Sequence, residues 1–128
     1  MTVALPLMVI DTTVLIDLAR GHAGARDWAV SVDHRLVASE VTRFELLVGA
    51  RATERRSLEQ LMRVCQWIAV DEAISRTAAT LGHRWRPSHP GLAMADLLIA
   101  ATAVELGAPL ATANVRHFPM LDGLAAPY

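Results

Sequence analysis

Short apolar runs alternate with segments of helical spacing along this chain. The apolar runs have the length of buried strands and lie at residues 7–10, 35–38, 65–70 and 109–114. Helical spacing of apolar residues predicts helices at 13–20, 25–32, 40–50, 58–62, 71–85 and 92–106. Strands that alternate with helices predict an α/β fold with a parallel sheet covered on both faces. A fifth strand is expected in the last few residues.

Several helix ends carry residues that favour them. Ser39 can cap the helix that follows it, and Gly107 ends the last predicted helix. GHAG at 21–24 should separate two helices. RPSHPG at 86–91 must be a loop because its prolines and glycine disrupt regular structure.

The composition fits one globular domain over residues 1–128, with 53% hydrophobic and 20% charged residues. No apolar run approaches the roughly 20 residues of a membrane helix. The apolar N-terminus has no preceding basic residues and is interrupted by Asp11, unlike a signal peptide. The single cysteine, Cys65, suits a reducing compartment. We therefore expect a soluble, cytoplasmic protein that does not enter a membrane.

The charge pattern excludes several classes of function. A net charge of −1 gives no general attraction to nucleic acid. All 12 basic residues are arginine, so mechanisms that require lysine are excluded. This argues against haloacid-dehalogenase phosphatases and phosphoacceptor receiver domains, which normally use a lysine. The glycine-rich motifs of nucleotide-binding α/β domains are also missing from the sequence.

An aspartate interrupts the apolar sequence VIDTTVLID at residues 9–17. Asp11 directly follows the first predicted strand, and parallel sheets bind ligands at the carboxyl ends of their strands. The alternative is that Asp11 caps a helix that begins at Thr12. Asp17, further along the same segment, is more typical of a solvated helix acid than of a catalytic residue.

Two further acids fall on apolar helix faces. Glu45 shares a stripe with Val41 and Val48, and the alternative is a capping box in which Thr42 is the N-cap. Asp96 lies among leucine, isoleucine and alanine neighbours, and the alternative is an N-cap for a helix that starts one residue later.

The fold class would bring Asp11, Glu45 and Asp96 together at one edge of the sheet. Two carboxylates about 5 Å apart repel by roughly 3 kcal/mol at an effective dielectric of 20. A cluster of this kind needs a cation or bound protons, and carboxylate oxygens suit Mg²⁺ or Mn²⁺. The pattern therefore indicates that Asp11 is a metal ligand.

Four segments of the chain resemble the motifs of a known family in order and spacing. They are VIDTTVLIDL, ASEVTRFELLVGA, MADLLIAATA and LATANVRHF. Together they closely resemble the motifs of PIN-domain ribonucleases, and most closely those of the VapC toxins of bacterial toxin–antitoxin pairs. The resemblance implies a PIN-like three-layer α/β/α fold with a short parallel sheet of four to five strands. It also implies a Mg²⁺-dependent endoribonuclease, in which Mn²⁺ can substitute, that forms a homodimer and is silenced by a VapB-type antitoxin.

The resemblance also assigns roles to individual residues. The catalytic acids of the family correspond to Asp11, Glu45 and Asp96, and a fourth catalytic position corresponds to Asn114. Many relatives have an aspartate at this fourth position. An amide can bind an ion or its water, but it supplies no charge, and a second metal ion would be short of one carboxylate.

Hydroxyl and basic residues near these motifs complete the expected site. Thr13 and Thr112 occupy small-hydroxyl positions of the family, with helix-start and strand propensity as the respective alternatives. His117 could approach a phosphate or be a surface histidine. The candidates for RNA contacts are Arg43, Arg84, Arg86 and Arg116, because arginine binds phosphate through two parallel hydrogen bonds.

The expected chemistry is hydrolysis of RNA phosphodiesters by metal-activated water. The chain has no Gly-x-Ser-x-Gly motif, so a serine nucleophile of that type is not expected. The alternative function is a PIN-like module that binds RNA or a protein without cutting, and Asn114 in place of an acid is the feature that favours it.

Overall fold

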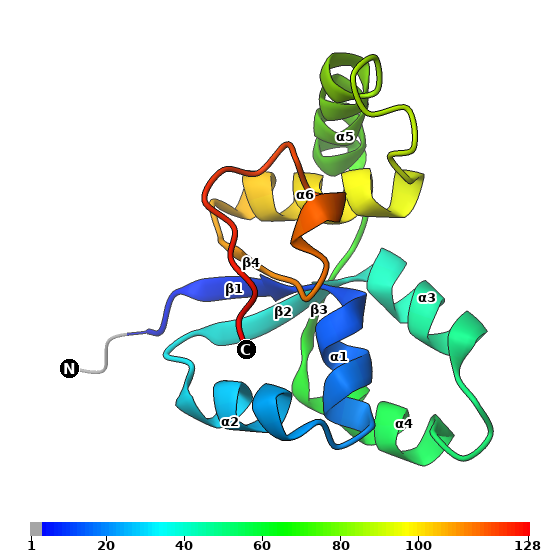
Figure 1. Ribbon diagram of the computed structural model, residues 1–128, viewed down its shortest axis with the longest axis vertical. Helices are drawn as coiled ribbons and strands as arrows, with labels where there is room; N and C mark the ends of the chain where they lie inside the picture. Colours follow the sequence, from blue (N-terminus) through cyan, green and yellow to red (C-terminus); the bar gives the residue numbers. More distant parts are fainter. Residues whose placement is uncertain (1–3) are drawn as a thin grey trace.

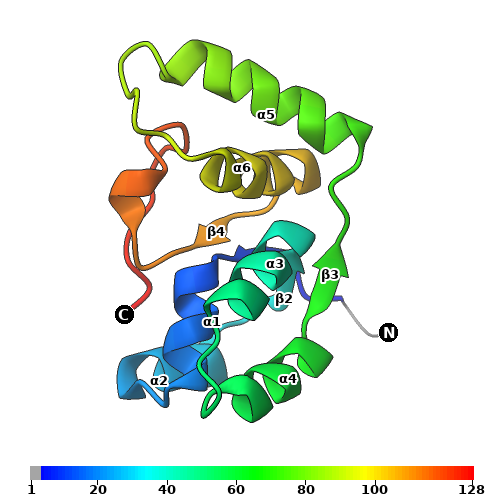
Figure 2. The same cartoon turned by 90° about the vertical axis from the view of Figure 1, so that its right-hand side faces the viewer.

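We describe residues 4–128 from a computed structural model (Figures 1 and 2). The strands are β1 Leu7–Ile10, β2 Arg35–Ser39, β3 Gln66–Ile68 and β4 Leu110–Ala111. The helices are α1 Thr12–Ala19, α2 Ala23–Ser31, α3 Glu40–Gly49, α4 Arg55–Val64, α5 Glu72–Trp85 and α6 Met94–Leu106, followed by the 3₁₀ helix η1 Val115–His117. In this part of the chain, no helix combines the length and the apolar character needed to cross a membrane.

The strands form one parallel sheet in the order β3-β2-β1-β4. The four predicted strands are confirmed, and β1 has the predicted bounds. The fifth strand is not: the described residues after η1 form turns and coil. Pro119 and Pro127 lie in that segment and have no N–H to donate to a strand partner, which explains the difference.

Helices cover both faces of the sheet. Neighbouring residues of a strand point to opposite faces, so each strand contributes side chains to the core on both sides. Ile10 and Ala38 pack with residues of α1, α3 and α4 on one face. Val9 and Val37 pack with residues of α6 on the other face. The amphipathic helix α5 then packs on α6 as a further layer (Figure 2). The predicted three-layer α/β/α arrangement is confirmed.

The boundaries of two helices test the capping predictions. Ser39 caps α3, since its Oγ accepts from the amide of Val41 at 3.1 Å. The separation predicted at 21–24 is partly wrong, because α2 already begins at Ala23. His22 makes this start possible: its Nδ1 accepts from the amide of Ala25 at 3.2 Å and so takes the place of a polar cap residue.

Tyr128 fastens the C-terminal tail to the helices on the α1 side of the sheet (Figure 1). Its hydroxyl donates to Oδ2 of Asp17 at 2.6 Å, and its ring centroid lies 5.2 Å from that of His22 and 6.4 Å from that of Trp28. Burial, together with the hydrogen bond to Asp17, raises the pKa of Tyr128. Asp17 is therefore a half-buried anchor for the tail, and the expectation of a solvated acid is wrong.

We expect Tyr128→Phe to lower the free energy of unfolding by about 1 kcal/mol, because Asp17 loses its hydrogen-bond donor while the ring contacts remain. Urea unfolding of the variant beside the wild type measures this difference. Asp17→Asn keeps an oxygen that can accept from Tyr128 and should cost less. Equal free energies of unfolding for Tyr128→Phe and wild type would show that this hydrogen bond does not stabilise the fold.

Candidate active site

Asp11 lies buried between the end of β1 and the start of α1, with 4% of its surface exposed. It occupies the N-cap position of α1, but its side chain makes no capping hydrogen bond, so the capping alternative is wrong. Its Oδ2 instead accepts from the hydroxyl of Thr13 at 2.9 Å and from that of Thr112 at 2.7 Å. No described residue donates to Oδ1, which leaves that oxygen available for a ligand.

Backbone amides fix the direction of both hydroxyl groups. The amide of Asn114 donates to Oγ1 of Thr112 at 3.0 Å, and the amide of Ala113 donates to Oγ1 of Thr13 at 3.2 Å. Each hydroxyl accepts from an amide, so its own proton is free to point to Asp11. The loop that follows β4 is thereby tied to the start of α1, and the carboxylate of Asp11 is held in one orientation.

Glu45 projects from the middle of α3 toward the start of α1. Its Oε1 lies 2.6 Å from Oγ1 of Thr12, which is also 3.2 Å from Oγ1 of Thr42. The capping box predicted as an alternative is wrong, because α3 begins at Glu40 and Thr42 is buried inside the helix. No local sequence pattern indicates that Thr12 is a partner of Glu45, since the two residues are 33 positions apart.

Asp96 lies in the first turn of α6, two residues after the helix begins at Met94. It is therefore not the N-cap of this helix. Burial raises the pKa of Asp96, Asp11 and Glu45 raise it further, and nearby His117 opposes them. Nδ1 of His117 lies 3.4 Å from Oδ2 of Asp96, although the histidine side chain is 57% exposed. The like-charge effect links Asp96 to the other two acids.

Comparisons with known proteins agree with this arrangement. Residues 8–123 match the PIN domain. The chain belongs to the PIN-domain family. It is 42% identical over 125 residues to Ribonuclease VapC19 of Mycobacterium tuberculosis, which covers 95% of this chain and 100% of the relative.

Solved structures extend the similarity to the fold. A toxin–antitoxin complex from Klebsiella pneumoniae contains a chain that matches with a TM-score of 0.79 and 26% identity, over 94% of this chain and 98% of that one. VapBC-5 from Mycobacterium tuberculosis, a member of the VapBC family of toxin–antitoxin systems, matches with a TM-score of 0.68 and 29% identity, over 94% of each chain. The resemblance to PIN-domain proteins is confirmed.

The acids of this PIN domain have the chemistry of a site for a hard divalent cation. Asp11, which is almost fully buried at the end of β1, and Glu45 both raise the pKa of Asp96, and carboxylate oxygens are the ligands that such a cation prefers. As the side chains stand, however, no three acidic, histidine or cysteine groups among residues 4–128 lie close enough together to hold an ion. Glu45 contacts Thr12 and Asp96 contacts His117, so both would have to turn from these partners to share a cation.

Two of the arginines predicted to contact RNA are engaged elsewhere in the fold. Arg43 pairs with Glu40, with Nε and Oε2 2.6 Å apart, and its guanidinium lies 4.2 Å from the ring centroid of Trp67. Arg84 on α5 lies 5.5 Å from the ring centroid of Trp85. Arg84 lies on α5, which packs on α6 as the outer layer of the fold (Figure 2).

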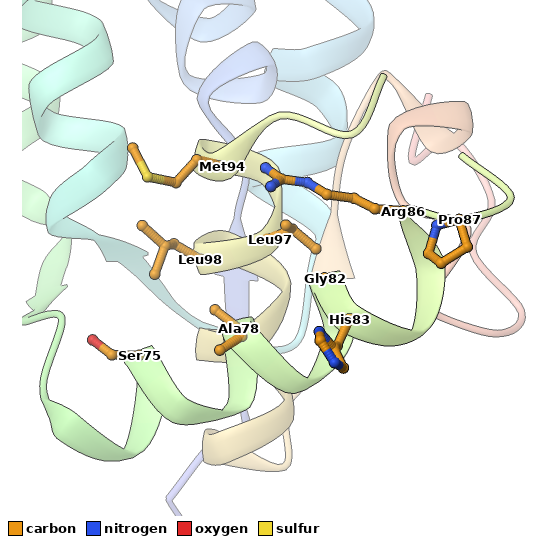
Figure 3. A pocket seen from close by; sticks show the side chains of 10 residues that line it. Ser75, Ala78, Gly82, His83, Arg86, Pro87, Met94, Leu97 and Leu98 are labelled. Carbon is orange, nitrogen blue, oxygen red and sulfur yellow. The ribbon is translucent and has the colours of Figure 1, made fainter. Parts of the chain in front are cut away.

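The other two arginines lie in surface hollows. Arg86 lines a hollow of about 780 Å³ between α5 and α6, where its side chain extends over Leu97 toward Met94 (Figure 3). Arg116 belongs to η1 and lines a different hollow, which it shares with Asn114 and His117. Through His117 this second hollow adjoins Asp96, so Arg116 lines a hollow next to one of the three acids.

Proposed function

We propose that this protein is the toxin component of a VapBC-type toxin–antitoxin system and a metal-dependent endoribonuclease. The observation that carries the proposal is the buried Asp11, which the hydroxyls of Thr13 and Thr112 hold at the strand end and which, with Glu45, raises the pKa of Asp96. The similarity to Ribonuclease VapC19 over almost the whole chain supports the same reaction class.

Asp11 and Asp96 would be the direct ligands of a Mg²⁺ ion, for which Mn²⁺ could substitute, and Glu45 would be a further ligand or would hold the attacking water. The ion would lower the pKa of a bound water and neutralise charge on the phosphate. Thr13 and Thr112 keep Asp11 in a fixed orientation, which avoids reorganisation when substrate binds. Asn114 would contribute an uncharged amide at the fourth family position.

Protein partners are part of the proposal. Phe44 is 67% exposed and Met94 is 69% exposed, and with Val70 and Leu98 they line an apolar hollow of about 390 Å³ beside α3 and α6. Exposed apolar surface of this kind marks a protein contact. The similarity to VapBC-5, a member of the VapBC family of toxin–antitoxin systems, supports a VapB-type antitoxin as one partner. A second copy of the chain, giving a homodimer, would be the other.

Cleavage of total RNA by the purified protein tests the proposal. With Mn²⁺ or Mg²⁺ we expect discrete fragments, and with EDTA we expect intact RNA, because the three carboxylates cannot promote attack on a phosphate without a cation. Mapping the fragment ends would identify the preferred RNA. RNA that is bound but left intact in both metals would favour the non-catalytic module, for which Asn114 in place of an acid is the supporting feature.

A further inference from the structure

A polar hollow of about 530 Å³ lies between η1 and the C-terminal tail, next to the proposed catalytic acids. It is lined by residues 113–117 on one side and by Ala126 on the other. His117 belongs to this lining and lies 3.4 Å from Asp96, so the hollow and the acids share a wall. Its volume is within the range of small-molecule sites and sufficient for one nucleotide.

The charges of this hollow differ from those of the acids beside it. Arg116 is exposed and forms no ion pair with any other residue in the range 4–128. Asn114 adds an uncharged amide, which can donate and accept hydrogen bonds without repelling an anion. The three carboxylates repel a phosphate group. In the neighbouring hollow, the same group could contact the guanidinium of Arg116 and the uncharged amide of Asn114.

The tail forms a fixed wall of the hollow. Ala126 lies two residues before Tyr128, whose hydroxyl is bound to Asp17 and whose ring packs against His22 and Trp28. The position of Ala126 is thus set by a contact on the α1 side of the sheet. A wall held in this way gives the hollow a defined shape before any ligand arrives.

We propose that this hollow binds the nucleotide next to the scissile phosphate of a single-stranded RNA, with the phosphate of that nucleotide on Arg116. The inference rests on the proposed function and deepens it, since it places the RNA strand between η1 and the tail. Arg116 then supplies the attraction to RNA that the net charge of the chain does not.

Binding of a short oligoribonucleotide tests the inference without metal or catalysis. All variants carry Asp11→Asn, so the RNA stays intact, and binding is measured by fluorescence anisotropy at several salt concentrations. Arg116→Ala should weaken binding about fivefold and lower the salt slope by about 0.7, as for one lost phosphate contact. Arg63→Ala is the matched control, because Arg63 is exposed on α4 and the charge change is the same. It should change neither value.

A second pair of variants tests the shape of the hollow without changing charge. Ala126→Trp fills it and should weaken binding about tenfold, whereas Ala125→Trp, at the exposed neighbouring position, should not. Thermal melting of each variant confirms that it folds. If Arg116→Ala matched Arg63→Ala and Ala126→Trp matched Ala125→Trp, the inference would be overturned and the proposed function would stand. A parent protein that bound no RNA at any salt concentration would overturn both.

Discussion

Replacement of Asp11 by asparagine should lower the rate of RNA cleavage about a thousandfold or more. Asparagine keeps an oxygen that can accept from Thr13 and Thr112, so the side chain should stay in place in its pocket. What is lost is the charge that would bind and polarise the metal ion. A thousandfold loss corresponds to about 4 kcal/mol of transition-state stabilisation. The measurement is the initial rate of cleavage of a labelled RNA in Mn²⁺.

Asp17→Asn is the matched control, because it makes the same chemical change on α1, the helix that begins directly after Asp11. Asp17 is not one of the acids that influence Asp96, and its amide variant keeps an oxygen that accepts from Tyr128, so the C-terminal tail stays in place. Its amide variant should cleave at close to the wild-type rate. Equal loss in both variants would mean that the effect comes from α1 as a whole, and equal activity of Asp11→Asn and wild type would point to a contaminating nuclease.

Much of the fold could be predicted because the strands are buried on both faces. Residues 7–10 and 36–38 are continuous apolar runs, and in the structure they lie in the central pair of strands, β1 and β2. The short β4 and the coil after η1 were harder to predict, since few residues pair there. The start of α2 was misplaced because His22 caps it through its imidazole, and histidine is not among the residues that usually signal a helix start.

The sequence suggests that the three acids lie near one another, and their effect on the pKa of Asp96 agrees with this, but the orientations of their side chains could not be predicted. The alternatives for Glu45 and Asp96 depended on the residues at which α3 and α6 begin. If either helix began two or three residues later, its acid would stabilise the helix start and would not be a candidate metal ligand. The hydrogen bond from Thr112 to Asp11 joins residues 101 positions apart, which no local pattern contains. The role of Thr12 toward Glu45 depends in the same way on how α1 packs against α3.

The arginines show a further limit of prediction from the sequence. Nearness to a motif along the chain suggested Arg43, but an acid three residues earlier already offers it a partner on the same helix. That spacing was visible in the sequence and argued against a free guanidinium. Arg116, by contrast, has no acid at such spacing, and only the fold shows that it lies beside Asp96 through His117.

Asp96→Asn should abolish cleavage and at the same time stabilise the metal-free protein, by on the order of 0.5 kcal/mol after screening by solvent. The pKa of Asp96 is raised, so the fold disfavours its ionised form at neutral pH. An amide removes that unfavourable charge from the neighbourhood of Asp11 and Glu45. Thermal melting in EDTA measures the gain, and RNA cleavage in Mn²⁺ measures the loss of activity.

The pH dependence of this gain has a definite sign. Because the pKa of Asp96 is higher in the folded than in the unfolded state, its contribution to stability is fully present below the ordinary value of 3.8 and is lost as pH rises through the folded pKa. The advantage of Asp96→Asn over the wild type should therefore grow as pH rises from 3.8 and then level off. Making both proteins with His117→Asn removes the imidazole that contacts this acid, so the difference between them reports the carboxyl group alone.

Metal ions should reverse the order of stability. At a Mg²⁺ concentration ten times its dissociation constant, wild type should gain about 1.4 kcal/mol, because the ion binds only the folded cluster. Asp96→Asn lacks one of the proposed ligands and should gain little. The melting temperature of wild type should then lie below that of Asp96→Asn in EDTA and above it in saturating Mg²⁺. If Asp96→Asn were less stable than wild type in EDTA, the favourable contacts of the Asp96 carboxylate would outweigh its unfavourable charge. That result would contradict the expected gain in stability.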